Sequence, residues 1–261
     1  GWIHVYCEDG QEVLDTTLQA FRLAETVNLP VMVVLDAFYL SHTYEAADVP
    51  AQEEVDGFLP PYVPRFQLDT AHPCGFGPLV PPADYMEMRH SIAMAMEEAL
   101  VRFDEIEDDF AGRFGRRYGP VEAIGCEDAE IVFVTTGTLT STCRLVVDEL
   151  RSKGDKAGIL KLKLLRPFPF ERIRQALKRA KKVAVIDRNF SFGAGGIFAQ
   201  EVRAALCNVP DHPPVFGFVA GIGGRDVTPG LLMEIYEQVR KSEAPQRESV
   251  WMGLKEVNHA D

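Results

Sequence analysis

The stretch Lys182-Val-Ala-Val-Ile-Asp-Arg-Asn-Phe-Ser-Phe-Gly-Ala-Gly-Gly196 decides the fold. It opens with an apolar run that ends on Asp187, which is typical of a strand buried on both faces of a parallel sheet. A glycine-rich turn follows, and then a segment with Phe198, Val202 and Leu206 at helical spacing. In open α/β sheets, ligands and partner chains meet the carboxyl ends of strands. We therefore expect function at this turn.

The same alternation of strand and helix continues on the N-terminal side of this stretch. Ile131–Val134 and Ala157–Leu165 are apolar runs of strand length, and the segments after Gly137 and from Phe170 to Ala180 have helical periodicity. Strands that alternate with helices through short connections form a parallel sheet. The sequence therefore predicts a compact α/β domain over residues 129–240, followed by a tail over 241–261.

Residues 1–45 have the pattern of a fragment of a different sheet. Ile3–Cys7 and Pro30–Asp36 are predicted strands, the second buried on both faces, and Gln11–Thr26 is a predicted helix. Two strands and one helix cannot close a core. We expect these residues to be the end of a larger α/β domain whose beginning lies elsewhere.

Residues 46–128 are predicted to be a proline-rich arm and a long connecting helix. Glu45–Pro82 contains eight prolines and has no sustained periodicity, but large apolar residues recur along it. Freely disordered segments usually lack such residues, so we expect an ordered arm laid across another surface. Ala83–Tyr118 has one long helical pattern that would connect domains or pack along a subunit contact.

Charge is distributed unevenly along the 261 residues, whose net charge is −12. Residues 131–207 hold 15 Lys and Arg against 6 Asp and Glu, while the rest holds 12 against 33. Two interpretations stay open: a solvated surface, or docking of the basic domain against an acidic subunit or a polyanionic cofactor. The overall acidity disfavours nucleic-acid binding. No apolar run approaches membrane-span length and no leader is visible, so we expect a soluble, cytoplasmic protein.

The five cysteines form no C-x-x-C pair. Disulfide frameworks, zinc sites and iron–sulfur sites all need closely spaced thiolates. We expect all five to be reduced and this chain to hold no metal.

Two stretches supply the main candidate binding residues, and two further segments supply weaker ones. In the turn after Asp187, the residues Arg188, Asn189, Gly193 and Gly195 could form a backbone nest for a phosphate, or only a tight structural turn that needs positive φ. The spacing matches neither of the common glycine-rich nucleotide motifs. Both interpretations stay open.

The second stretch follows the predicted strand that ends at Asp36. Ser41, His42 and Glu45 would lie at the carboxyl end of the sheet, where a substrate or cofactor is approached. A lone loop histidine can equally be a hydrogen-bonded structural residue. Thr135–Thr138, a hydroxyl-rich turn, offers a helix cap or a weak phosphate contact. Arg166 can pair with a carboxylate.

Three segments carry a resemblance to a known family: Gln52-Glu-Glu-Val-Asp-Gly-Phe-Leu-Pro-Pro-Tyr62, Leu165-Arg-Pro-Phe-Pro169 and the turn after Asp187. The chain resembles the α subunit of 2-oxoacid:ferredoxin oxidoreductases of the pyruvate type, from about residue 8 to about residue 240. The resemblance implies an α/β fold in which the end of a thiamine-diphosphate-type pyrimidine domain precedes a parallel α/β domain similar to the C-terminal domain of transketolases.

The resemblance also implies a reaction, cofactors and partners. The reaction is the oxidative decarboxylation of a small 2-oxoacid, most often pyruvate, with CoA to acyl-CoA, CO₂ and reduced ferredoxin. Thiamine diphosphate with Mg, [4Fe-4S] clusters and CoA are held in the complex, mainly by other subunits or by the N-terminal part of the α subunit. The partners are a β subunit with the diphosphate half-site, γ and δ ferredoxin-like subunits, and ferredoxin.

No catalytic residue can be carried over, because the family's catalytic residues lie in a region that no position of this sequence matches. The family's G-D-G…N-N motif for diphosphate and magnesium is absent as well. The isolated chain is therefore expected to be inactive. The alternatives are a related enzyme for oxalate, phenylglyoxylate or a branched-chain 2-oxoacid, and a transketolase-like assembly module without catalysis of its own.

Overall fold

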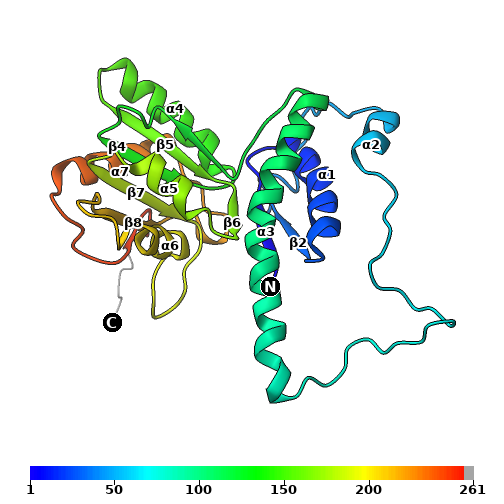
Figure 1. Ribbon diagram of the computed structural model, residues 1–261. Coiled ribbons are helices and arrows are strands. Elements are labelled where there is room, and N and C mark those ends of the chain that lie inside the picture. Colours follow the sequence, from blue (N-terminus) through cyan, green and yellow to red (C-terminus); the bar gives the residue numbers. More distant parts are fainter. Residues whose placement is uncertain (256–261) are drawn as a thin grey trace, which may run out of the picture.

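The computed structural model describes residues 1–255 and contains two β-sheets that lie side by side (Figure 1). The larger sheet has six strands in the order β3-β5-β4-β7-β8-β9, and the smaller has three in the order β2-β1-β6. The large sheet belongs to the second half of the chain. The small sheet belongs to the first half, except for β6.

The six-stranded sheet is parallel apart from its β3 edge, which runs antiparallel to β5. Its strands are β3 (Val121–Ile124), β4 (Ile131–Thr135), β5 (Ala157–Leu162), β7 (Lys182–Asp187), β8 (Val215–Val219) and β9 (Val250–Trp251). Every residue of β4, β5 and β8 is buried. A strand with both faces covered needs an unbroken apolar run, which is why β4 and β7 were predicted correctly.

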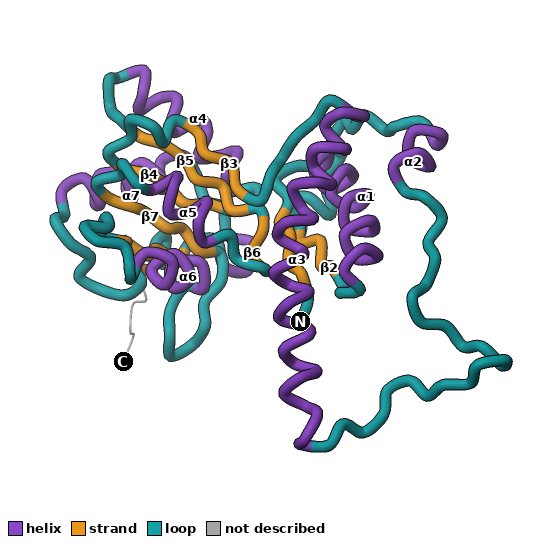
Figure 2. Tube along the Cα trace, in the orientation of Figure 1, coloured by secondary structure: helices purple, strands orange, loops and turns teal. Residues whose placement is uncertain are grey.

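Helices cover both faces of this sheet (Figure 2). One face carries α5 (Phe170–Leu177) and α6 (Ile197–Leu206), and the other carries α4 (Leu139–Ser152) and α7 (Pro229–Lys241). Each layer buries its own apolar cluster against the strands. The second half is therefore a doubly wound α/β domain, and the predicted fold class is confirmed.

The strand expected over Ala157–Leu165 is in fact two strands. After β5 the chain leaves the large sheet, and β6 (Leu164–Arg166) pairs antiparallel with β1 (Ile3–Tyr6) of the small sheet. Lys163 lies between the two strands and is fully buried. A continuous apolar run cannot reveal this change of sheet, because the change depends on a pairing between residues about 160 positions apart.

The first half of the chain packs one helical layer on the small sheet. It comprises β1, α1 (Gly10–Val27), β2 (Val31–Val34) and the upper part of α3 (Pro82–Phe114). The second strand, expected to be buried on both faces within a larger domain, is only partly covered by the described residues. β2 is an edge strand, and its Met32 is 42% exposed.

A long arm leaves this unit and returns along α3 (Figure 2). The arm was expected to have no regular structure, but it contains one short helix, α2 (Gln52–Phe58), whose Phe58 is buried against α3. Seven residues are too few for a clear periodic signal. β3, β8, α7 and β9 were also not anticipated. The positions expected for a tail include 256–261, which lie outside the described residues.

Candidate functional site at the carboxyl edge of the large sheet

The carboxyl edge of the six-stranded sheet has a topological switch point between β4 and β7. The chain leaves β4 toward β5 on one side and returns to β7 on the other. In open α/β sheets the crevice at such a point is the usual binding position. Here five side chains from four segments meet there, and we name them the carboxyl-edge cluster: Asp36, Tyr39, Thr138, Arg188 and Asp226.

Asp36, from the first half of the chain, is at the centre of the carboxyl-edge cluster. Its Oδ2 accepts hydrogen bonds from the Thr138 backbone N–H at 2.9 Å, from the Thr138 hydroxyl at 2.5 Å and from Arg188 Nη1 at 3.1 Å. A carboxylate is stabilised at the N-terminus of a helix, here α4, by the unpaired amides and the helix dipole. The Asp36 carboxylate therefore occupies the position in the crevice where an anionic ligand would otherwise bind.

Gly137 allows the Asp36 carboxylate to come close to the N-terminus of α4. Its φ is +60°, and a Cβ built there would lie 2.7 Å from Asp36 Oδ2. The predicted cap by a threonine hydroxyl takes a different form, since Thr138 donates its hydroxyl proton to Asp36 rather than capping α4.

A pocket of about 360 Å³ opens beside the cluster. Tyr39 lies on its wall, donates its hydroxyl to Asp226, and stacks under the Arg188 guanidinium at 4.9 Å. Asp226 belongs to the turn Gly221-Ile-Gly-Gly-Arg-Asp226, which the sequence reasoning missed. A glycine-rich turn directly after an apolar run was the available signal, because Gly221, Gly223 and Gly224 all have positive φ.

The candidates Ser41 and His42 lie in the loop that the carboxyl-edge cluster holds. The Ser41 hydroxyl accepts from the Phe38 backbone N–H at 3.0 Å and lies 2.7 Å from His42 Nδ1, while Phe38 stacks on the His42 ring. Glu45 lies apart from them. Its Oε2 accepts from the Gly10 backbone N–H at 2.7 Å, at the start of α1.

The candidates in the glycine-rich turn lie in two different surroundings. Arg188 belongs to the carboxyl-edge cluster. Asn189 accepts the Ile197 backbone N–H at 3.0 Å and so caps α6. Gly193 and Gly195 have φ of +86° and +128° in a small hairpin-like turn.

The N-terminus of α6, where a phosphate nest would form, is filled by Asp187. This fully buried carboxylate accepts the backbone N–H groups of Phe198 at 2.8 Å and Ala199 at 3.1 Å. Burial raises the pKa of Asp187 to about 6, against the opposing effect of these hydrogen bonds. A buried acid at this position favours the structural interpretation of the turn.

A second polar cluster joins the two halves of the chain, and we name it the ionic joint: Glu8, Glu12, Arg144, Lys161 and Lys163. Lys161 lies 2.8 Å from Glu8 and 2.9 Å from Glu12, and Lys163 lies 2.7 Å from Glu12. Arg144 pairs with Glu8 at 2.9 Å. The uneven charge of the sequence is thus partly explained, because basic residues of the second half dock on acidic residues of the first.

Unfolding is expected to become easier as the pH falls from about 4.5 toward 2. Burial alone would raise the pKa of Glu8, but Arg144, Lys161 and Ser141 outweigh it and hold the pKa near 2, below its usual 4.5. Protons therefore bind the unfolded state first, and the stabilisation is lost as the pH falls. Urea unfolding at several pH values should show this slope, and Glu8→Gln should reduce it. An unchanged slope in the variant would contradict the assignment.

The loop 36–43 is expected to lose protection when Asp36 is replaced with alanine. The Thr138 backbone N–H and hydroxyl would lose a part-buried acceptor and Arg188 one of its two, which costs about 1–3 kcal/mol and corresponds to roughly 5- to 150-fold faster amide exchange. Hydrogen exchange on the purified chain measures this. Asp226→Ala, which removes only an exposed contact to the same loop, is the matched control. Equal exchange in both variants would show that Asp36 does not hold the loop.

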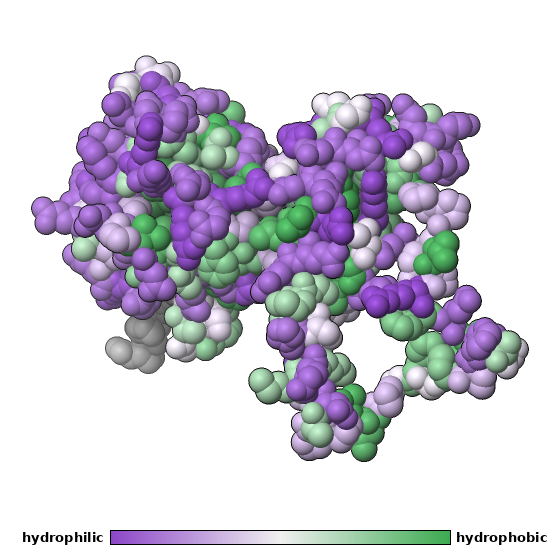
Figure 3. Space-filling view, viewed as in Figure 1, coloured by the Kyte–Doolittle hydropathy of each residue, from purple (hydrophilic) through white to green (hydrophobic). Residues whose placement is uncertain are grey.

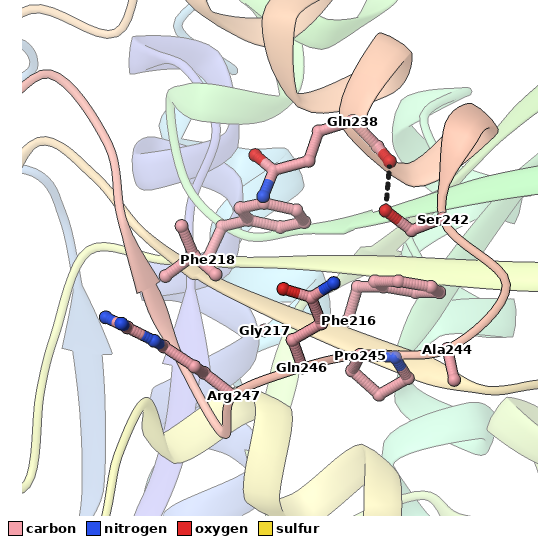
Figure 4. A pocket seen from close by; sticks show the side chains of 10 residues that line it. Phe216, Gly217, Phe218, Gln238, Ser242, Ala244, Pro245, Gln246 and Arg247 are labelled. Carbon is pink, nitrogen blue, oxygen red and sulfur yellow. Dashed lines mark hydrogen bonds between the residues drawn. The ribbon is translucent and has the colours of Figure 1, made fainter.

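Another pocket, of about 290 Å³, lies beside β8, α7 and the loop after it (Figure 4). Phe216 and Phe218 form its floor, while Gln238 and Arg247 lie at its sides. Both rings are almost fully buried. The Ser242 hydroxyl beside it already donates to the Gln238 backbone carbonyl at 2.8 Å, and no cluster of charged side chains converges on this pocket among the described residues. The carboxyl-edge cluster is therefore the better candidate site.

All five cysteines are free in this structure. Within residues 1–255, no group of three or more His, Cys, Asp or Glu side chains is arranged to hold a metal ion. None of the helices described there is both long enough and apolar enough to cross a membrane.

The fold and the filled crevice define a two-part α/β protein whose second part is a doubly wound domain docked on a smaller sheet. Two family models match it: "pyruvate flavodoxin/ferredoxin oxidoreductase, thiamine diphosphate-binding" over residues 1–108, and "pyruvate:ferredoxin oxidoreductase core domain II" over residues 129–232. The chain belongs to the pyruvate:ferredoxin oxidoreductase family.

Curated relatives align over nearly the whole chain. Pyruvate synthase subunit PorA of Methanothermobacter thermautotrophicus is 45% identical over 258 residues, and ketoisovalerate oxidoreductase subunit VorA of Pyrococcus abyssi is 43% identical over 260. Each alignment covers 98% of this chain and 66% of the relative. The chain thus spans just under two thirds of the length of these relatives.

A solved structure has the same fold. The 2-oxoglutarate:ferredoxin oxidoreductase from Magnetococcus marinus matches with a TM-score of 0.55 at 17% identity, covering 91% of this chain and 42% of that one. This likeness supports the fold class. The resemblance inferred from the sequence is confirmed at the level of the family.

Proposed function

We propose that this chain is part of the α subunit of a multisubunit, thiamine-diphosphate-dependent 2-oxoacid:ferredoxin oxidoreductase acting on pyruvate. The observation that carries the proposal is the 45% identity to a pyruvate synthase subunit along 98% of the chain. The overall reaction converts a 2-oxoacid, CoA and oxidised ferredoxin into acyl-CoA, CO₂ and reduced ferredoxin. Electrons leave singly through iron–sulfur clusters.

The residues of this chain do not fit the diphosphate and metal of the cofactor. The helix N-terminus after the glycine-rich turn already holds Asp187, and the one at the switch point already holds Asp36. A diphosphate at either position would meet a carboxylate. We therefore propose that β, γ and δ subunits and other parts of the α subunit hold thiamine diphosphate with Mg, CoA and the [4Fe-4S] clusters.

This chain contributes structure to such a complex. The ionic joint fixes the large sheet against the small one, and the carboxyl-edge cluster fixes the loop that carries Ser41 and His42. We propose that this loop faces the active site and that its position is the chain's contribution to catalysis. Its two polar side chains would orient a substrate or cofactor through hydrogen bonds. The complex is proposed to be cytoplasmic.

A branched-chain 2-oxoacid is the second candidate substrate, because the ketoisovalerate oxidoreductase subunit is 43% identical over a similar length. Kinetic measurements on the assembled enzyme distinguish pyruvate from 2-ketoisovalerate.

The test is to express a tagged copy of the full subunit in its own host and isolate the native complex without oxygen. CoA-dependent reduction of ferredoxin is then followed with pyruvate, 2-ketoisovalerate, oxalate and phenylglyoxylate. The proposal expects the highest kcat/KM with pyruvate. A higher value with 2-ketoisovalerate would assign the second candidate, and reduction with none of the four would contradict the proposed activity.

A further inference from the structure

We propose that residues 45–98 form an acidic clasp that holds a basic, apolar-anchored surface of a different polypeptide. The acidic clasp consists of the arm and the protruding half of α3. It lies outside the candidate site, and the inference does not depend on which reaction the complex catalyses.

The first observation is that, among the described residues, the N-terminal half of α3 packs only weakly: Met96 is partly buried against the core, and no helix residue before Ala99 is fully buried. The buried residues of this helix begin only at Ala99, although the helix starts at Pro82. The protruding half extends away from both sheets, and the arm bows outward beside it (Figure 1). Most of the stability of helices in proteins comes from packing of an apolar face, which the protruding half of α3 largely lacks here.

The second observation is a continuous apolar stripe along α3. Its packed part is Ala99, Phe103, Ile106 and Phe110, which face α1 and β1. The same stripe continues at helical spacing through Met96, Ile92, Met88 and Tyr85 on the protruding half, where Tyr85 is 51% exposed. Since the packed half buries this stripe, the protruding half offers the same kind of surface to another chain.

The third observation is that the arm carries exposed apolar side chains opposite that helix: Val63, Phe66, Leu68, Phe76 and Leu79. Figure 3 shows apolar side chains on both the arm and the protruding helix, with open space between them. Large exposed apolar side chains gathered around one opening are typical of a protein–protein contact. Leu79, at 96% exposure, makes almost no contact within the chain.

Charge identifies the class of partner. Residues 45–98 hold ten Asp and Glu and two Arg, and the first lysine of the sequence is Lys153. Among the described residues, Glu53, Glu54, Asp56, Asp84 and Glu87 have no Lys or Arg within salt-bridge distance, whereas most acidic residues of 104–109 do. Unpaired carboxylates around an apolar surface favour a partner with Lys and Arg around its own apolar anchors.

A second copy of this chain is a poor occupant. Most of the Lys and Arg residues of its basic region form ion pairs within the chain. These pairs include the ionic joint, Lys153–Glu149 and Lys181–Glu130. Little basic surface is left over to complement the acidic clasp. Charge therefore disfavours a second copy of this chain as the occupant, and we assign the acidic clasp to a different polypeptide of the complex.

Zero-length carbodiimide cross-linking of the native complex tests this directly. It joins carboxylates to lysines in contact, and residues 1–152 contain no lysine, so the acidic clasp cannot link to itself. We expect links from Glu53, Asp56, Asp84 or Glu87 to lysines of another polypeptide. Links to Lys153–Lys241 between isotopically light and heavy copies would show a second copy, and links to lysines of the α subunit outside this chain would show the same polypeptide; either result would overturn the proposal. Links no more frequent than those from exposed Asp148 would overturn it as well.

A charge variant supplies an independent readout. Asp84→Asn combined with Glu87→Gln should lower the salt concentration that dissociates the complex by at least twofold. Asp148→Asn combined with Glu243→Gln removes the same charge from exposed positions elsewhere and is the matched control. Equal dissociation of both double variants would contradict a charged contact at the acidic clasp.

Discussion

Gly196→Ala is expected to destabilise the large-sheet domain by about 3–5 kcal/mol, because the new methyl group displaces a buried carboxylate. A Cβ at position 196 would lie 2.9 Å from Asp187 Cβ, 2.5 Å from its Cγ and closer still to Oδ2. Asp187 would have to move away from the amides of Phe198 and Ala199, leaving buried polar groups unpaired. The measurement is urea unfolding followed by tryptophan fluorescence.

The two tryptophans separate the halves of the molecule. Trp2 belongs to the first half and Trp251 to β9, so a Trp2→Phe background leaves one reporter of the large sheet. Gly230→Ala is the control, because the nearest atom to its Cβ would be 3.8 Å away. A Gly196→Ala protein within 1 kcal/mol of the control would contradict the role of Asp187 as the internal anion of α6.

Glu12→Ala should lower the free energy of unfolding by about 3–5 kcal/mol, which is the usual effect of removing one partner of a buried ion pair. It would leave Lys161 and Lys163 buried with one carboxylate, Glu8, near only the first of them. Burial tends to raise the pKa of Glu12, yet the two ammonium groups lower it overall, so the carboxylate is charged near neutral pH. Unfolding monitored by Trp2 and by Trp251 should shift together, since the ionic joint connects both halves.

Two further variants distinguish a buried charge effect from a general loss of stability. Glu149→Ala, which breaks an exposed pair with Lys153, should change the unfolding free energy by less than about 1 kcal/mol. Glu12→Met combined with Lys163→Met should recover much of the loss, because apolar residues of similar size need no counter-charge. A double variant as unstable as Glu12→Ala would show that the charges themselves stabilise the joint.

Local sequence patterns predict the large sheet well and the small sheet poorly. β7 was correct to the residue, because an apolar run between a helix end and a glycine-rich turn has few other structures available. β6 was missed because its partner is β1, at the other end of the chain. β2 was expected to be a buried strand from its apolar residues, and which strands lie beside it cannot be read from those residues.

The candidate site was predicted in part. Arg188 was named, and Ser41 and His42 lie in the loop that Arg188 helps to hold through Asp36. Asp36 itself was read only as the end of a strand. Its contacts with Thr138 and Arg188 join residues 102 and 152 positions apart, and no pattern within one segment can show such contacts. The roles of the candidate residues stay predictions.

The most direct test of the central claim is calorimetric titration of thiamine diphosphate with Mg²⁺ into two samples. One is this chain alone and the other is the native complex isolated through the tagged subunit. We expect stoichiometric binding to the complex and no binding to the chain alone, because its two helix N-termini at the carboxyl edge already hold Asp36 and Asp187. Stoichiometric binding to this polypeptide alone would contradict the claim that its contribution is structural.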